Sequence, residues 1–360
     1  MKILFSESEW YYRELGLKNV DGVDFVFDGM KYYKKPSLFL SQYELFVCAY
    51  YTMPHNVILT QKFKKAGIRT ILCSDGIFDF SNSFINPMHI KYGLRSFHPI
   101  LQYFFLCVGK NERNYFNQDT LAMEFMPNRM ISKKHASAMP ESKKVLITTA
   151  NTAYFNNEEY ELLLKLILSV TKFLIEKNID FSYRIFDISL ISAINEKYVG
   201  VLANDIEEGF EDTLERYSSV ITTPSSVAVV SMFHRRPTAL LIYRDYPMFL
   251  QTGWLIPSID VFKGQFNDFL DGDDSRMAIQ DRLLSNYMTK EGITDRILQA
   301  SKVEFKGDDE RESYIIKSYE NMLLSKFNFN FEWFVRKIYR KLKSFKGFSN
   351  VLNRLKKRVF

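Results

Sequence analysis

The chain has few of the residues that build metal sites and disulfide frameworks. Its 360 residues include three cysteines and five histidines. Cys48, Cys73 and Cys107 sit inside apolar runs without pairing or metal-ligand spacing, which indicates buried free thiols and a reducing compartment. The histidines are scattered, so the sequence predicts neither a zinc site nor a metal cofactor.

Long apolar runs and dinucleotide motifs are missing as well. No apolar stretch reaches about 20 residues, which predicts no membrane span. The first apolar run, in MKILFSESEW, stops at Ser6 and Glu7, so no secretory signal is expected. The pattern G-x-G-x-x-G does not occur, which leaves dinucleotide binding without support. A cytoplasmic protein fits these absences best.

Acidic residues are missing from one basic segment at the end of the sequence. Residues 336–360 contain ten Lys and Arg and no acid, so subtracting this +10 from the chain's net charge of +6 leaves −4 over the other 335 residues. Most of the chain is therefore mildly acidic, which argues against nucleic acid as its partner.

Short apolar runs of strand length alternate with helix-like segments along most of the chain. In the first half the runs include KILFSES, YELFVCAYY and RTILCSDG, and the pattern restarts at KKVLITTAN after a polar stretch at 128–144. Apolar strands that alternate with helices are typical of a parallel sheet covered on both faces. We expect an α/β chain with two Rossmann-like domains, at residues 1–130 and 143–310, followed by a helical segment at 311–360.

One stretch, YSSVITTPSSVAVVSMF (217–233), places small hydroxyl residues between an apolar run and a helix-like run. In one interpretation Ser225 or Ser226 only caps the helix, as such residues do in many proteins. In the other, the hydroxyls and the free N–H groups of the first helical turn hold an anion, most often a phosphate.

The order of elements over 205–245 resembles the nucleotide-binding half of bacterial GT-B enzymes that use CMP-activated acidic sugars or CDP-activated alditols. GT-B enzymes have two Rossmann-like domains that face each other across a cleft. The resemblance implies that Ser225 and Ser226 bind the phosphate of the nucleotide, with Thr222 and Thr223 shaping the pocket at the strand end.

A second stretch, RTILCSDGIFDFSN (69–82), ends a predicted strand at Ser74-Asp75-Gly76. Asp-Gly is a common turn, but ligands of open α/β sheets lie beyond the carboxyl ends of strands. The position is similar to an acidic–acidic–Gly motif of sialyltransferase-like and Kdo-transferase-like enzymes, which implies that Asp75 is the base that deprotonates the acceptor. Ser74 departs from that motif, and Asp79 is a reserve candidate.

The same families carry a His-Pro pair in the second domain, and this chain departs from that pattern. SYRIFD (182–187) stands in the corresponding region, with Arg184 as its cation, while a His98-Pro99 pair occurs in the first half. Three explanations stay open: Arg184 replaces the His, His98 reaches the phosphate from across the cleft, or the pair is fortuitous. Glu208, on a loop in the second half, could reach a ribose or base or remain solvated. The acidic run at 271–274 is expected to cap a helix rather than bind a metal.

The segment 331–360 mixes apolar and basic residues at helical spacing. Its apolar positions recur every three or four residues, with Lys and Arg filling much of the remaining circumference: Phe331, Phe334, Val335, Ile338, Leu342 and Phe345. This pattern is typical of a helix that lies in an anionic membrane surface. The alternatives are a helix that packs back on the first domain and, less favoured, a contact with nucleic acid.

Together these observations favour a metal-independent, inverting GT-B glycosyltransferase of bacterial surface polysaccharide synthesis. The expected donor is a nucleotide sugar, preferably a CMP-linked ulosonic acid such as Kdo or sialic acid. The expected acceptor is a glycan or lipid-linked glycan at the inner face of the cytoplasmic membrane. The alternatives are a CDP-alditol phosphotransferase of the teichoic-acid type and a non-catalytic assembly factor docked on the membrane.

Overall fold

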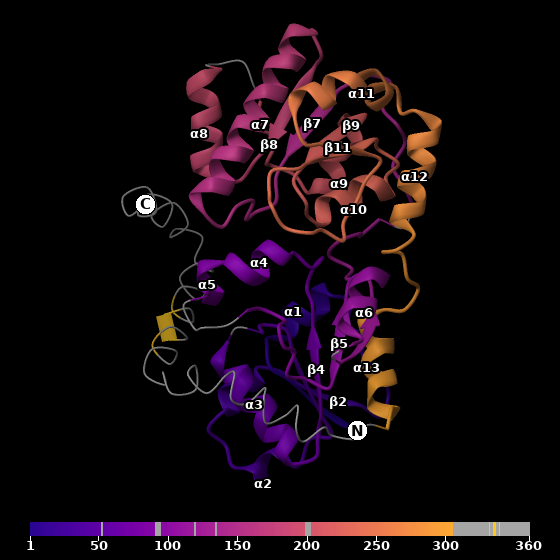
Figure 1. The fold of residues 1–360 in the computed structure, drawn as a ribbon. Helices are drawn as coiled ribbons and strands as arrows, with labels where there is room; N and C mark the ends of the chain where they lie inside the picture. Colours follow the sequence, from indigo (N-terminus) through magenta and orange to yellow (C-terminus); the bar gives the residue numbers. More distant parts are fainter. Residues whose placement is uncertain are drawn as a thin grey trace.

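The computed structural model describes residues 1–304, apart from Thr52, 91–94, Asp119, Lys134 and 199–202, together with Phe331, Phe334, Val335 and Ile338. Within these residues the chain forms two α/β domains, one above the other in Figure 1, each built on a single parallel sheet. The expected fold class of two Rossmann-like domains is confirmed.

The first domain contains a parallel sheet of order β2-β1-β3-β4-β5-β6. Its strands are β1 (Lys2–Phe5), β2 (Asp24–Val26), β3 (Leu45–Cys48), β4 (Arg69–Cys73), β5 (Phe104–Cys107) and β6 (Leu121–Glu124). Its helices are α1 (Glu9–Glu14), α2 (Ser37–Leu40), α3 (Pro54–Lys65), α4 (Phe80–Ile85), α5 (Pro87–Ile90) and α6 (Lys110–Phe116), with a 3-10 turn at Gly29–Tyr32. Successive residues of β4 enter different hydrophobic clusters, Ile71 with α1 and Leu72 with α3, so both faces of the sheet are covered.

The second domain has a parallel sheet of order β11-β10-β9-β7-β8. Its strands are β7 (Val145–Thr148), β8 (Phe181–Arg184), β9 (Ser219–Thr222), β10 (Thr238–Leu241) and β11 (Trp254–Ile256). Its helices are α7 (Asn157–Glu176), α8 (Ile188–Lys197), α9 (Phe210–Thr213), α10 (Ser226–Phe233), α11 (Ile259–Asp271) and α12 (Asp274–Leu284), with a 3-10 turn at Leu214–Arg216. The central strands β7, β9 and β10 are buried along their whole length because helices cover both faces of the sheet.

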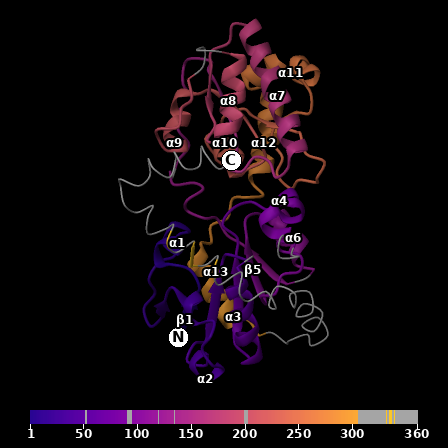
Figure 2. The same ribbon diagram turned by 90° about the vertical axis from the view of Figure 1, so that its left-hand side faces the viewer.

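The chain returns to the first domain after α12, which corrects the expected second domain at 143–310. Helix α13 (Ile293–Lys302) lies beside the sheet of the first domain in Figures 1 and 2. Its buried residues Ile293, Ile297 and Ala300 complete the hydrophobic cluster around Ile71 and Phe104. Sequence alone assigned α13 to the wrong domain because an amphipathic helix does not show which sheet its apolar side covers.

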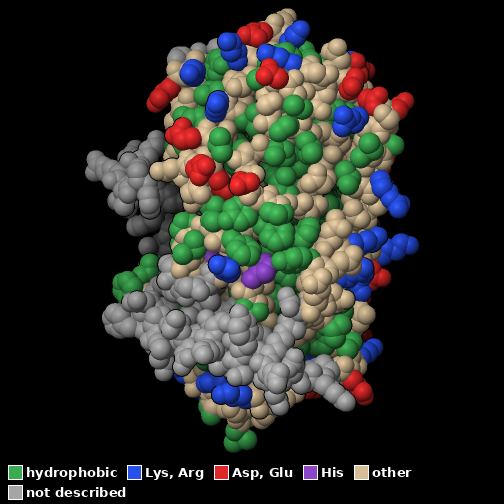
Figure 3. Space-filling view, in the orientation of Figure 1, with side chains coloured by type: hydrophobic (Ala, Val, Ile, Leu, Met, Phe, Trp, Pro, Cys, Tyr) green, Lys and Arg blue, Asp and Glu red, His purple; other side chains and the backbone are tan. Residues whose placement is uncertain are grey.

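The two domains share a hydrophobic contact. Val108 and Met130 of the first domain belong to one cluster with Ala228 and Met232 of α10. On another side, the ring of Phe80 in α4 lies with its centroid 5.2 Å from that of Phe249. Figure 3 shows hydrophobic side chains gathered where α4 approaches the second domain.

The segment expected to bind membranes, 331–360, lies outside the described residues except for four positions, and so does the rest of the expected helical segment at 311–330. Phe331, Phe334, Val335 and Ile338 are in helical conformation and their side chains are exposed. In the part of the chain that is described, no helix is long and apolar enough to cross a bilayer.

Candidate functional site

A cavity of about 1050 Å³ opens at the carboxyl edge of the second sheet. The second domain contributes residues 148–151 at the end of β7, Arg184 at the end of β8 with Phe186 after it, residues 209–212, and Val230 with the start of α10 (225–227). The first domain and the linker contribute Arg129, Met130 and Ser132. Strands β7 and β9 are neighbours, but the chain leaves them toward opposite edges of the sheet, so the cavity lies at a topological switch point. Open α/β sheets bind their ligands at such points.

Hydrogen bonds between the strand ends shape this cavity. Thr148 donates its hydroxyl to the Arg184 carbonyl over 2.9 Å, which joins β7 to β8. Thr223 accepts the Ala150 N–H at its Oγ1 over 2.8 Å, which joins the loop after β9 to the loop after β7. Thr222 donates to the Thr223 carbonyl, and both threonines are fully buried. They stand behind the cavity and are not among its lining residues, so direct contact with a phosphate stays a prediction.

Two hydroxyls at the cavity have no partner among the described residues. Ser225 is the N-cap of α10, yet its side chain makes no capping bond and its Oγ is buried without a partner. Thr149, after β7, is 3% exposed and its Oγ1 is equally unpartnered. An unsatisfied buried hydroxyl costs about 1–3 kcal/mol, so a ligand that accepts hydrogen bonds here recovers that free energy. Helix α10 adds the free N–H groups and positive dipole end of its first turn.

Ser225 and Ser226 thus lie where the sequence placed them, at the start of a helix that enters a cavity. Other helices use their caps in the ordinary way: Asn156 accepts from Glu159 N and Ser258 from Val261 N. The capping interpretation of Ser225 is therefore wrong for its side chain, and the anion-binding interpretation stays a prediction.

Arg184 also lines the cavity, but the nearby loop holds its guanidinium. It donates to the carbonyls of Asp205 and Glu208 over 2.6 and 2.8 Å and to Thr213 Oγ1 over 3.3 Å. Burial lowers the pKa of Arg184 from its ordinary value. Its guanidinium carbon lies 5.1 Å from the centre of the Phe186 ring. Carbonyls and a hydroxyl accept these bonds, and the negative charges of Asp205 and Glu208 also favour the protonated guanidinium.

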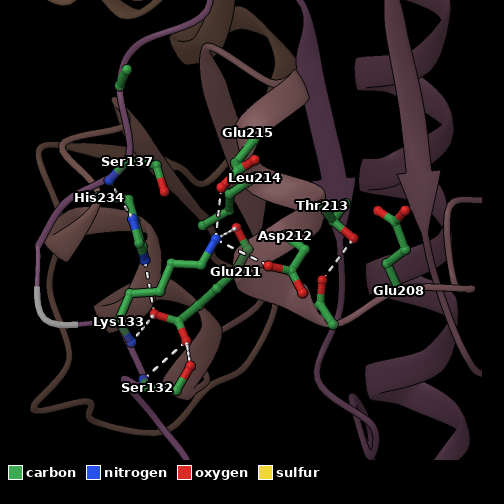
Figure 4. A network of polar contacts seen from close by, with 12 residues as sticks. Ser132, Lys133, Ser137, Glu208, Glu211, Asp212, Thr213, Leu214, Glu215 and His234 are labelled. Carbon is green, nitrogen blue, oxygen red and sulfur yellow. Dashed lines mark hydrogen bonds and ion pairs between the residues drawn. The ribbon is translucent and has the colours of Figure 1, made fainter.

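Glu208 does not line the cavity. Its carboxylate pairs with Arg216 over 2.6 Å, and its side chain points away from Glu211 in Figure 4. The acids that do line the cavity are Glu211 and Asp212, and the half-exposed Glu208 side chain fits the solvated alternative better than contact with a ribose or base.

Glu211 holds the interdomain linker, as Figure 4 shows. Its carboxylate accepts the backbone N–H groups of Ser132 and Lys133 over 2.9 and 3.3 Å, the Ser132 hydroxyl, and His234 Nε2 over 2.9 Å. Partial burial raises the pKa of Glu211, but the bonds from Ser132, His234 and Lys133 outweigh it and hold the pKa below its ordinary value. Arg236 secures the linker further on, donating to the Ala138 carbonyl over 2.7 Å.

Asp75 lies at the carboxyl end of β4 and makes an ion pair with Arg129, 2.9 Å from Arg129 Nη2 to Asp75 Oδ2. Arg129 and Ser225 both line the cavity, whereas Asp75 is not among its lining residues and adjoins it through this ion pair. The Asp75 side chain is half exposed.

The two reserve candidates have structural roles instead. Asp79 caps α4 by accepting the Ser81 N–H and makes an ion pair with Arg244 of the second domain. His98 is bonded to Ser83, to the Ser96 carbonyl and to the Tyr115 hydroxyl within an aromatic cluster of the first domain. Neither lines the cavity: Asp79 is engaged by a cation of the second domain, and His98 is bonded within its own domain, which favours the fortuitous explanation of the His-Pro pair.

No cluster of three or more potential metal ligands occurs within the described ranges. In the acidic run at 271–274, Asp273 accepts the Arg276 N–H and caps α12, as expected.

Sequence reasoning missed Arg129, Thr149 and Glu211. Thr149 carried a signal, since Thr-Thr-Ala-Asn after β7 parallels Thr-Thr-Pro-Ser after β9. Arg129 and Glu211 carried no such signal. The role of a cation in a linker, or of an acid in a loop, depends on the partners that the fold brings next to it.

Comparisons with known proteins agree with this architecture. No protein-family model matches the chain, and no curated protein matches its sequence. Among solved structures, a candidate UDP-N-acetylglucosamine 2-epimerase from Listeria monocytogenes matches with a TM-score of 0.56 and 10% identity over 84% of this chain and 95% of that one. The lipopolysaccharide outer core galactosyltransferase WaaB matches with a TM-score of 0.50 and 11% identity over 84% and 99%. HepE from Anabaena, in complex with UDP-glucose, matches with a TM-score of 0.50 and 10% identity over 88% and 100%. At these identities the likeness shows the fold alone: two parallel-sheet domains in the GT-B arrangement.

Proposed function

We propose that the protein is a glycosyltransferase that uses a nucleotide-activated sugar. The observation that carries this proposal is the pair of buried, unpartnered hydroxyls, Thr149 and Ser225, beside the free N-terminus of α10. Hydroxyls and amide dipoles fixed at one point suit a phosphate, whose oxygens accept several hydrogen bonds at once. The rings of Phe186 and Phe210 line the same cavity and offer apolar surfaces to a nucleobase.

In the proposed reaction the acceptor approaches from the side of Asp75. Asp75 takes the proton of the acceptor hydroxyl while its oxygen attacks the anomeric carbon. The bond from that carbon to the phosphate oxygen breaks, and its electron pair stays on the phosphate. Ser225, Ser226 and the α10 N-terminus stabilise this leaving group, and the products are an inverted glycoside and a free nucleotide.

For the donor we propose a CMP-linked ulosonic acid, which the resemblance of 205–245 favours. A UDP-linked sugar is the second candidate, because HepE, with the same fold, binds UDP-glucose. The CDP-alditol phosphotransferase reaction is less favoured, because those enzymes use histidine bases. Among the described residues, no histidine lines the cavity.

We also propose a peripheral location on an anionic membrane, which the apolar spacing and basic charge of residues 331–360 support. Phe331, Phe334, Val335 and Ile338 keep the spacing of one helical side and are exposed. The basic residues at 336–360 add attraction to anionic lipid. Such a location would place the enzyme beside a lipid-linked acceptor.

The central test is nucleotide binding by calorimetry with CMP, CDP, UDP and GDP, followed by a turnover screen with the corresponding sugars. Ser225→Ala should weaken nucleotide binding about tenfold without lowering the melting temperature, since this hydroxyl bonds to nothing in the described protein. Ser258→Ala is the matched control: that serine caps α11, so its loss should cost about 1 kcal/mol of stability and leave binding unchanged.

Asp75→Asn should abolish turnover while nucleotide binding persists. If no nucleotide binds the wild-type protein, the proposal is wrong. If nucleotides bind but no sugar is transferred or hydrolysed, a non-catalytic assembly factor is the better description.

A further inference from the structure

The ion pair between Arg129 and Asp75 stands at the mouth of the cavity. In addition to the 2.9 Å contact with the carboxylate, Arg129 Nη2 donates to the Asp75 carbonyl. The side chains are 36% and 50% exposed. Ion pairs with this exposure contribute about 0–1 kcal/mol, so replacing one partner costs little.

Two other charged groups of the cavity wall, Arg184 and Glu211, are held more firmly, whereas Asp212 is 63% exposed and makes a surface ion pair. Arg184 is bonded to two carbonyls and a hydroxyl of the neighbouring loop. Glu211 is bonded to the linker and to His234, and Asp212 pairs with Lys133 over 3.0 Å. Arg129 differs because its carboxylate partner lies outside the wall of the cavity and is itself half exposed.

The backbone holds Arg129 in the wall of the cavity that the start of α10 also lines. Its N–H donates to the Glu14 carbonyl over 3.1 Å, at the end of α1. The next residue, Met130, is buried in the cluster that contains Ala228 and Met232 of α10. A first-domain cation and Ser225 thereby line the same cavity.

We propose that Arg129 is the first domain's ligand for the phosphate of the donor, and that donor binding exchanges its partner. The phosphate takes the guanidinium, which forms charge-assisted, geometrically matched bonds with it. Asp75 is then released from its cation and is free to accept the acceptor's proton. This inference rests on the proposed function and adds an order to it: the nucleotide sugar binds first, and its binding prepares the base.

The test separates phosphate from nucleoside recognition. Calorimetry would compare CMP and UDP with cytidine and uridine for wild type, Arg129→Ala and Arg129→Lys. Arg129→Ala should weaken nucleotide binding about tenfold or more and leave nucleoside binding unchanged, with Arg129→Lys in between. Arg113→Ala is the matched control, since Arg113 pairs with Glu124 over 3.1 Å at 37% exposure away from the cavity; it should change neither.

Asp75→Asn supplies the readout that a merely structural ion pair would not give. It removes the competitor for Arg129, so nucleotide affinity should rise about two- to fivefold. In the Arg129→Ala background the same substitution should have no effect on affinity.

The outcomes distinguish a failure of the proposed function from a failure of the proposed partner exchange at Arg129. If wild type binds no nucleotide, the proposed function fails and this inference with it. If wild type binds nucleotide and Ser225→Ala weakens it, but Arg129→Ala does not, the exchange alone is wrong. An Asp75→Asn variant that binds nucleotide more weakly than wild type would also overturn it.

Discussion

Arg244 of the second domain is bonded to Asp79 of the first, and this ion pair fastens one side of the domain interface. The Arg244 side chain is 4% exposed and also lies 3.4 Å from the carboxylate of Glu159, measured from its Nε. Glu159 in turn accepts the hydroxyl of Ser81 from the first domain. The guanidinium of Arg244 therefore pairs with two carboxylates, Asp79 from the first domain and Glu159 from the second.

Removing this cation should destabilise the protein strongly. Arg244→Met leaves two poorly solvated carboxylates without a cation, which should lower the free energy of unfolding by about 3 kcal/mol or more. Chemical denaturation would measure it, with Arg235→Ala as the control. Arg235 is 70% exposed and 3.8 Å from Asp281, so its loss should be almost neutral. A small effect of Arg244→Met would mean that this ion pair contributes little to holding the domains together.

The Glu211 bonds predict a pH-dependent stability. The pKa of Glu211 in the folded protein lies below its ordinary value of 4.5. Its contribution is therefore complete above about pH 4.5 and is lost as the pH falls through the folded value. Glu211→Gln should cost about 2 kcal/mol at pH 7, and the difference in melting temperature from wild type should shrink as the pH drops below that value.

Glu215→Gln is the control for this measurement. Glu215 is exposed and pairs with Lys133 at the surface, so its substitution should change stability little at any pH. A gap between wild type and Glu211→Gln that stays constant down to pH 3 would contradict the role of the ionised carboxylate.

Thr149→Val should separate stability from binding. The substitution keeps the shape of a side chain that is 3% exposed and removes a hydroxyl without a partner in the described structure. We expect the melting temperature to stay the same or rise, while nucleotide affinity falls about three- to tenfold. Thr148→Val makes the useful comparison, because Thr148 bonds to the Arg184 carbonyl and its loss should lower stability. If Thr149→Val is the less stable of the two, its hydroxyl has a partner in the protein.

The basic tail predicts charge-dependent membrane binding. Changing four cations, Arg336, Lys337, Arg340 and Lys341, to Gln should weaken cosedimentation with phosphatidylglycerol vesicles at least tenfold, since each nearby cation contributes about 1 kcal/mol. Nucleotide binding should be unaffected. Phosphatidylcholine vesicles test the electrostatic part, and Phe331→Ser with Phe334→Ser tests the apolar part. Equal binding of wild type and the Gln variant would remove the membrane proposal.

The fold was readable from the sequence because strands and helices carry strong local patterns. Runs such as LFVCA, within YELFVCAYY, are apolar throughout, which is typical of a strand buried on both faces, and the restart at KKVLITTAN separated the two sheets. Ser225 and Asp75 were found for a related reason: both follow a predicted strand directly, and the carboxyl ends of parallel strands are where ligands bind.

The partners of these residues could not be read in the same way. Nothing in the sequence tells that Asp79 meets Arg244 across 165 positions, or that Glu211 meets a linker 79 positions earlier. His98 carries a familiar dipeptide, yet its ring is used within its own domain. Residue type predicts what a side chain can do, whereas the packing of the two domains decides which partner it meets.

The return of α13 makes the second domain an insertion within the first. Translation therefore delivers the whole of the upper sheet before Ile293 and Ile297 leave the ribosome. Until then the apolar side chains around Ile71 and Phe104 that α13 covers in the finished protein are exposed. The nascent protein can complete its second domain while the first is still unfinished, and a stop or frameshift near residue 290 would leave a folded second domain attached to a first domain with exposed, aggregation-prone apolar side chains.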